Sequence, residues 1–206
     1  AGLDDVYCKN NVPSIPLSGT LQFAVASTWS GGVGGSISDV SSLNSTYTPS
    51  PTDLANDSVA IFIESSGSFF SCPNDKDTVV FYFTDPPSVT AGADIVTCSS
   101  NDMVSIAGLV SGASTTGIWS TSGSGAFDPT ETNLSTDYLI SSADTSSGTV
   151  QLTLTSTNNG NCLAVTDNLT ITIVDKPEIT ITTPDSICAN VPQIDLTGAV
   201  TSGFSH

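Results

Sequence analysis

The chain has 206 residues, with 20 acidic against three basic side chains, and its formal net charge at pH 7 is -17. This charge balance argues against nucleic acids as partners and disfavours anionic membrane surfaces, because binding to either needs clustered Lys and Arg. No run of about 18 apolar residues is long enough to span a bilayer, and recurring alternation of apolar and polar residues argues against disorder.

The predicted elements are short β-strands separated by turns. In chain order, a strand with Trp29 leads into the glycine-rich segment 31–35, and an aromatic strand lies at 81–83. Clearer strands follow at residues 95–98, 103–110, 117–120, 135–141, 150–155 and 169–173. No segment has a convincing helical period. About seven short strands with regular turn signals predict an all-β fold, an antiparallel Ig-like β-sandwich.

The sequence repeats with a period of about 90 residues. Five cysteines and both tryptophans obey the period: Cys8, Cys98 and Cys188; Cys72 and Cys162; Trp29 and Trp119. Leu43 and Tyr47 recur one position out of register as Leu134 and Tyr138. We therefore expect a first repeat at 1–87, a second at 88–177, and the N-terminal part of an incomplete third at 178–206. The parent protein is then expected to be longer.

Cysteine spacing predicts one disulfide per repeat. Cys8 and Cys72 are 64 residues apart, as are Cys98 and Cys162, so the expected pairs are 8–72 and 98–162. Cys188 would then have its partner outside this sequence. Free buried cysteines or a zinc site are weaker alternatives, because there is no CxxC motif. Disulfides indicate an oxidising, extracellular compartment.

Residues for enzymatic chemistry are scarce. The one histidine, His206, is the last residue, which disfavours nucleophilic triads. Most acidic residues stand beside turn-forming residues rather than in a recognisable catalytic pair. Segment 31–35 lacks the Lys-Ser/Thr of a phosphate-binding loop. We expect no enzyme and no cofactor.

Two further kinds of site are possible at the surface. Calcium could bind carboxylates near the repeat junctions, although no EF-hand-like loop is present; the candidates are Asp4, Asp5, Asp85, Asp94 and Asp175. Trp29 and Trp119 could stack on sugars, but their matching positions favour core tryptophans.

The second repeat carries a recognisable pattern. It comprises Ala91-Gly92, Asp94, Cys98, Gly108, Trp119-Ser120, Gly125, Phe127, Pro129, Leu134, Tyr138, Gly148-Thr149-Val150, Leu152-Thr153-Leu154-Thr155, Asn159-Gly160-Asn161-Cys162, Asp167 and Leu169-Thr170-Ile171-Thr172-Ile173. This resembles the tandem Ig-like or PKD-like repeats of Bacteroidota cell-surface adhesins, the SprB type of gliding motility, which use type IX secretion. The first repeat departs from it in its glycine-rich turn and aromatic strand.

The resemblance implies a bacterial cell-surface location and no catalytic residue. It also implies possible O-glycosylation of Asp-Ser/Thr-apolar triplets, which here would modify Ser58, Thr78 and Ser186. The predicted function is a structural and adhesive segment of a large secreted filament protein. Its expected partners are neighbouring repeats, and surface polysaccharides or other filament subunits are further candidates. The alternative is a carbohydrate-binding module, or an accessory domain of a secreted polysaccharide-active enzyme.

Overall fold

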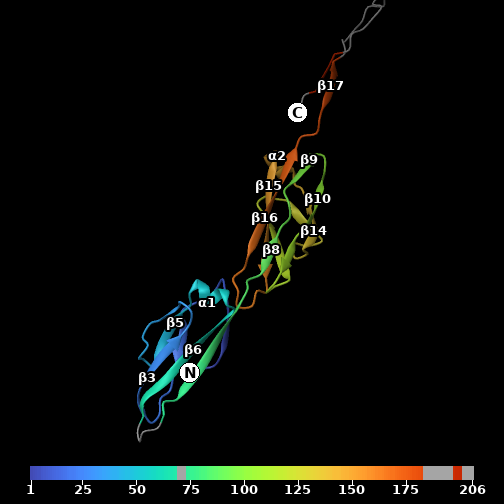
Figure 1. The fold of residues 1–206 in the computed structure, drawn as a ribbon. Coiled ribbons are helices and arrows are strands. Elements are labelled where there is room, and N and C mark those ends of the chain that lie inside the picture. The colour runs from blue at the N-terminus through green and yellow to red at the C-terminus, as the bar shows by residue number, and fades with distance from the viewer. Residues whose placement is uncertain (69–72, 183–196, 201–206) are drawn as a thin grey trace, which may run out of the picture. The chain divides into compact units, whose positions relative to one another are not determined.

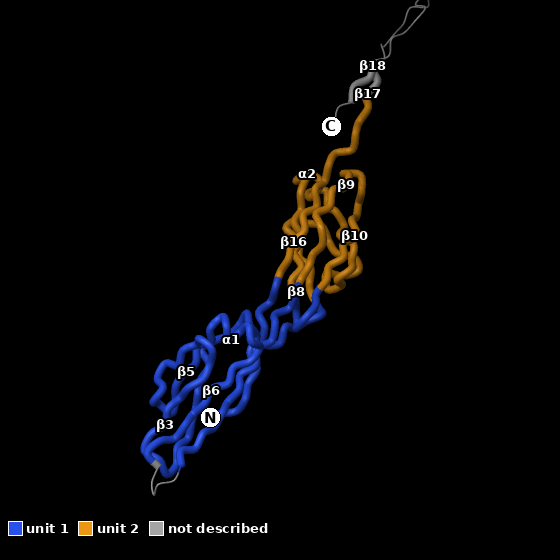
Figure 2. The backbone as a smooth tube through the Cα atoms, in the orientation of Figure 1, with its two compact units in different colours: residues 1–88, 110–116, 156–165 blue, residues 89–109, 117–155, 166–206 orange. Residues whose placement is uncertain are grey.

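A computed structural model describes residues 1–68, 73–182 and 197–200 (Figure 1). The described chain is all-β with two short helices, and it forms two β-sandwich domains, which confirms the predicted fold class. By compactness it divides into unit 1, residues 1–88, 110–116 and 156–165, and unit 2, residues 89–109, 117–155 and 166–206 (Figure 2). Two segments that belong to the second repeat in sequence, 110–116 and 156–165, therefore lie in unit 1. The second segment is called the tip below.

The sandwich in unit 1 has a four-stranded and a three-stranded sheet. The order of the first is β1-β7-β6-β3 and that of the second is β2-β5-β4. Their bounds are β1 Asp5–Cys8, β2 Ile15–Ser18, β3 Ala24–Gly31, β4 Ser36–Ile37, β5 Asn44–Thr48, β6 Ser58–Ser68 and β7 Lys76–Thr84. Helix α1, Pro51–Ala55, joins β5 to β6.

Strand alternation places the apolar side chains of unit 1 between its two sheets. On β6 the buried residues are Val59, Ile61 and Ile63, one at every second position, as the period of a strand requires. They pack in one core with Trp29 of β3 and with residues of β2, β5 and β7. The prediction that Trp29 is a core residue is confirmed.

Unit 2 holds the second sandwich, built from corresponding strands. Its sheets have the orders β12-β15-β16-β9 and β10-β14-β13. The bounds are β9 Ile95–Cys98, β10 Met103–Ala107, β12 Thr116–Thr121, β13 Ala126–Asp128, β14 Ser135–Leu139, β15 Thr149–Thr157 and β16 Thr166–Val174, with helix α2 at Ser142–Ser147. Trp119 is 2% exposed, so it too is a core residue.

Two short strand pairs complete the described structure. Strand β8, Ser88–Thr90, pairs with β11, Leu109–Ser111. Strand β17, Ile179–Thr182, pairs antiparallel with β18, Thr197–Val200. Among the described residues, neither helix is long or apolar enough to cross a membrane.

Two details differ from the sequence prediction. The strand expected at 103–110 is interrupted at Gly108, where a Cβ atom would lie 2.4 Å from the Leu154 side chain, so the backbone approaches the core closely. Helices α1 and α2 were not predicted. They have five and six residues, which is too short for a helical period to appear.

Candidate functional site

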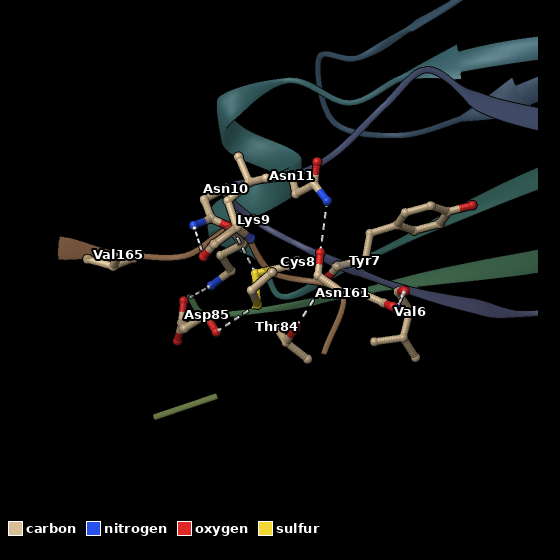
Figure 3. The surroundings of a disulfide bond; sticks show 12 residues. Val6, Tyr7, Cys8, Lys9, Asn10, Asn11, Thr84, Asp85, Asn161 and Val165 are labelled. Carbon is tan, nitrogen blue, oxygen red and sulfur yellow. Dashed lines mark hydrogen bonds and ion pairs between the residues drawn. A yellow bond between two sulfur atoms is a disulfide. The ribbon is translucent and has the colours of Figure 1, made fainter. Parts of the chain in front are cut away.

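One disulfide joins the end of β1 to the connection between β15 and β16. Cys8 and Cys162 are bonded, with a Cα–Cα distance of 4.9 Å and a sequence separation of 154. Both residues lie in unit 1. Cys8 is fully buried, and Figure 3 shows the side chains around the bond.

This bond corrects the predicted pairing of Cys8 with Cys72 and of Cys98 with Cys162. Cys98 lies opposite Val174, the last residue of β16, whereas Cys162 comes four residues before its first. At about 3.3 Å per residue, β16 separates these ends by about 26 Å. The four residue steps from Cys162 to Thr166 cannot close that gap to the roughly 7 Å limit for a disulfide. Cys72 and Cys188 lie outside the described residues.

Four hydrogen bonds hold the 161–163 segment against the end of β1; asparagine side chains donate three of them and accept the fourth. Asn10 accepts from the Leu163 amide at 3.1 Å and donates to the Leu163 carbonyl at 3.2 Å. Asn11 donates to the Asn161 carbonyl at 2.9 Å, and Asn161 donates to the Val6 carbonyl at 3.2 Å (Figure 3). The disulfide is therefore the centre of a specific docked interface within unit 1.

Lys9 places a positive charge next to the disulfide and the asparagine hydrogen bonds around it (Figure 3). Its ammonium group contacts Asp57 and lies 2.7 Å from Oδ1 of Asp85. Hydrogen bonds to these two carboxylates raise the pKa of Lys9. Because the ion pairs are open to solvent, their main effect is to fix orientation rather than to add much stability.

A buried tyrosine–aspartate pair lies beneath the glycine-rich loop of unit 1. Asp53 is fully buried and is the N3 residue of a capping box with Ser50. Its carboxylate accepts from the Tyr47 hydroxyl at 2.8 Å, from the Ser50 amide at 2.8 Å and from the Val33 amide at 2.6 Å. A Cβ atom at Gly35 would lie 2.2 Å from the Tyr47 hydroxyl, which explains the glycine there.

Unit 2 contains the same arrangement. Asp144 accepts from the Tyr138 hydroxyl at 2.9 Å, from the Ser141 amide at 3.0 Å and from the Ser124 amide at 2.9 Å. Ser141 is the N-cap of α2, with Asp144 again at N3. We call each of these buried pairs, Tyr47–Asp53 and Tyr138–Asp144, a hub. Each hub attaches a loop and a helix N-terminus to a core strand, so its role is structural.

The hub in unit 1 predicts an acid-sensitive domain. Burial raises the pKa of Asp53, but hydrogen bonds from Val33, Ser50 and Tyr47 outweigh it and lower the pKa from 3.8 to about 2. The ionised carboxylate thus stabilises the folded state above pH 4, and this contribution is lost as the pH falls towards 2. Urea unfolding between pH 5 and 2 should show the loss. Tyr47→Phe, which removes one hydrogen bond, should weaken the pH dependence; an unchanged dependence would contradict this account.

Four of the five aspartates predicted as calcium ligands interact with other groups of the protein, and the fifth is exposed. Asp4 accepts from the Val80 amide and Asp94 from the Thr170 amide, both at 2.8 Å. Asp5 accepts from the amide of Val6, Asp85 pairs with Lys9, and Asp175 is exposed. In the part of the chain that the structure describes, no three His, Cys, Asp or Glu residues gather as metal ligands. Calcium binding stays a prediction.

The glycosylation candidates lie on the surface where they are described. Ser58 begins β6 and Thr78 is on β7, and both are exposed. Ser186 lies outside the described residues. Sugar attachment therefore remains a prediction that the exposure of Ser58 and Thr78 permits.

Sequence reasoning missed the two hubs, although a signal exists. Tyr47 and Asp53 are six residues apart, as are Tyr138 and Asp144, and a serine precedes each aspartate by three positions. A Ser-x-x-Asp spacing is typical of a capping box. Finding it in both repeats would have indicated helices α1 and α2.

No protein-family model and no curated protein matches the chain. Solved structures similar to the chain include protocadherin gamma B2 extracellular cadherin domains 1-5, at 9% identity and TM-score 0.46, covering 92% of this chain and 42% of that one. Mouse cadherin-23 EC22-24 gives 10% and 0.43, covering 88% and 67%. Human protocadherin-24 EC1-2 gives 11% and 0.42, covering 85% and 96%.

The chain thus spans less than half of the protocadherin gamma B2 chain, and 53% of protocadherin gammaB7 EC3-6. At these identities the likeness concerns tandem cadherin-like or Ig-like β-sandwich repeats and extends to no shared site.

Proposed function

We propose that this chain is a structural and adhesive repeat segment of a large secreted protein that extends an attachment or gliding surface from a bacterial cell. The observation that carries the proposal is the Cys8–Cys162 bond, which covalently joins residues of two successive sequence repeats. A bond of this kind suits a chain of repeats under tension, because it limits how far the repeats can separate. The oxidised bond favours an extracellular location.

The sequence resemblance to gliding adhesins supplies the bacterial surface and the type IX secretion in this proposal. The composition supports it, because a net charge of -17 with 11% charged residues suits a soluble, polar surface. Neighbouring repeats are the first partners, and surface polysaccharides or other filament subunits are further ones.

The carbohydrate-binding alternative has weaker support. Both tryptophans are buried and so cannot stack on a sugar without unfolding. Tyr47 and Tyr138 are also buried, each with its hydroxyl bonded to an aspartate. Among the described residues, the large aromatic side chains that are exposed and could contribute to a sugar-binding face are Tyr82 on β7, at 47%, and Phe23, at 83%.

Surface labelling of the producing cell tests the proposal. Antibodies raised against the 206-residue chain should label intact cells, and the polypeptide detected on a reducing gel should be much larger than this chain. Pretreatment of cells with an external protease should remove the signal, while a cytoplasmic control protein stays intact. Labelling only after permeabilisation would contradict a surface role.

A further inference from the structure

We propose that Cys98, at the end of β9, is a second linking site, which forms a disulfide with a cysteine of a following repeat. In that repeat the cysteine would lie in the connection between the strands that correspond to β15 and β16. The cysteine would be the counterpart of Cys162, 90 positions further along the chain. The inference rests on the proposed function as a tandem repeat segment and names the partner of that segment.

The end of β9 has the same backbone geometry as the end of β1. Cys8 pairs in parallel with Thr84 of β7, and Cys98 pairs in parallel with Val174 of β16. In both copies the chain turns back after the cysteine, because the amide three residues further on donates to the cysteine carbonyl: Asn11 to Cys8 at 2.8 Å, and Asn101 to Cys98 at 2.9 Å. Cys98 is thus presented as Cys8 is.

Among the residues that the structure describes, Cys98 lacks the disulfide partner that Cys8 has, and it is less buried than Cys8. Cys8 is fully buried by its docked tip, whereas Cys98 is partly exposed and has no disulfide partner among the described residues. Val96, the counterpart of Val6, is 66% exposed, compared with 43% for Val6. The Val96 side chain and the Cys98 thiol are therefore more exposed than their counterparts Val6 and Cys8 in the first copy.

Most of the groups that hold the tip in the first copy have counterparts in the second. Asn11, which donates to the Asn161 carbonyl, corresponds to Asn101, and the Val6 carbonyl corresponds to that of Val96. Asn101 now donates to Thr97 Oγ1 at 3.0 Å, a short-range bond that it can exchange. Ser100 replaces Asn10, so the two bonds to Leu163 would be altered.

The sequence indicates where the tip comes from. The 90-residue period that relates Cys8 to Cys98 continues to Cys188, so a repeat of the same kind begins after residue 177. The segment that carries Cys162 and contacts the end of β1 belongs in sequence to the second repeat, which follows the repeat that contains β1. By the same offset, the segment that would contact the end of β9 comes from the repeat that follows the one containing β9.

The bond forms by two thiol–disulfide exchanges with a disulfide oxidant, either a small molecule or a protein. The Cys98 thiolate attacks one sulfur of the oxidant, which gives a mixed disulfide and one released thiol. The partner cysteine thiolate then attacks the Cys98 sulfur and releases the second thiol. Two electrons pass to the oxidant. Ser100 assists, because hydrogen bonds from its hydroxyl and amide lower the pKa of the Cys98 thiol.

The test is an extended chain in which a second copy of residues 88–177 follows residue 177, before residues 178–206, and the inserted copy carries C98S so that every Cys98 peptide comes from the original repeat. The original and extended chains are oxidised with oxidised glutathione, alkylated without reduction, digested and mapped by mass spectrometry. In the original chain, Cys98 should be alkylated while Cys8 and Cys162 are linked. In the extended chain, at least nine tenths of Cys98 should be linked to the inserted copy of Cys162.

A matched control carries C162S only in the inserted copy, and there Cys98 should again be alkylated. The Cys8–Cys162 peptide serves as an internal control for folding and oxidation. Three results would overturn the inference: alkylated Cys98 in the extended chain, Cys98 linked to any other cysteine, or Cys98 linked between molecules. None of these would alter surface labelling, so the linking site and the proposed function fail separately.

Discussion

Replacing Asp144 by alanine is expected to lower the free energy of unfolding of unit 2 by about 2–5 kcal/mol. The substitution leaves three donors without their acceptor: the buried Tyr138 hydroxyl and the part-buried amides of Ser141 and Ser124. A buried donor costs about 1–3 kcal/mol when it is left unsatisfied, and the lost contacts at the helix N-terminus cost about 0.5–2 kcal/mol. Urea unfolding measures the loss, and hydrogen exchange in β14 and β15 assigns it to unit 2.

Asp137→Ala is the matched control, because Asp137 lies one position from Tyr138 on the same strand. Its carboxylate accepts from Ser105 Oγ at 2.6 Å at the surface, and water can replace that bond. We expect a change within about 1 kcal/mol. Equal losses in the two variants would mean that the hub has no special role.

Removing the Cys8–Cys162 bond is expected to have the second large effect. The bond closes a loop with a sequence separation of 154, for which the chain-entropy model gives about 5 kcal/mol of stabilisation. The double variant Cys8→Ser, Cys162→Ser should therefore melt at a lower temperature than the oxidised protein. Amides of residues 159–163 should also exchange faster, because the asparagine contacts then hold the tip alone.

Two comparisons separate the loss of the bond from the effect of the serines. Reduction of the unaltered chain should lower its melting temperature by a similar amount. Cys98→Ser removes a thiol that makes no disulfide among the described residues, and it should leave the melting temperature of the chain unchanged. A double variant as stable as the oxidised protein would refute the stabilising role.

The fold was predictable because it depends on local alternation, whereas the cysteine pairing depends on strand direction. Residues 150–155 alternate apolar and polar side chains, and this alone predicts β15. The pairing needed the information that β9 lies parallel to β16 rather than antiparallel. A 64-residue spacing contains no such information, since equal spacings in two repeats fit pairs within a repeat and pairs between repeats equally well.

The buried hubs were hidden from sequence reasoning for a different reason. An aspartate beside Ser and Thr is typical of exposed turns, and Asp53 and Asp144 have such neighbours. Their burial follows from tertiary packing, which brings a glycine-rich loop over each tyrosine hydroxyl. Trp29 and Trp119 were easier, because a large apolar residue on an alternating strand belongs in the core.

The position of the disulfide also decides how the protein carries mechanical load. When the two termini are pulled apart, the covalent path runs from residue 8 directly to residue 162, so the intervening chain bears no tension along its backbone. At about 3.3–3.6 Å per extended residue, some 500–550 Å of contour length is withheld until the bond is reduced. Force would then lengthen the oxidised protein only through its terminal segments, and reduction would turn a short, stiff element into a long, extensible one.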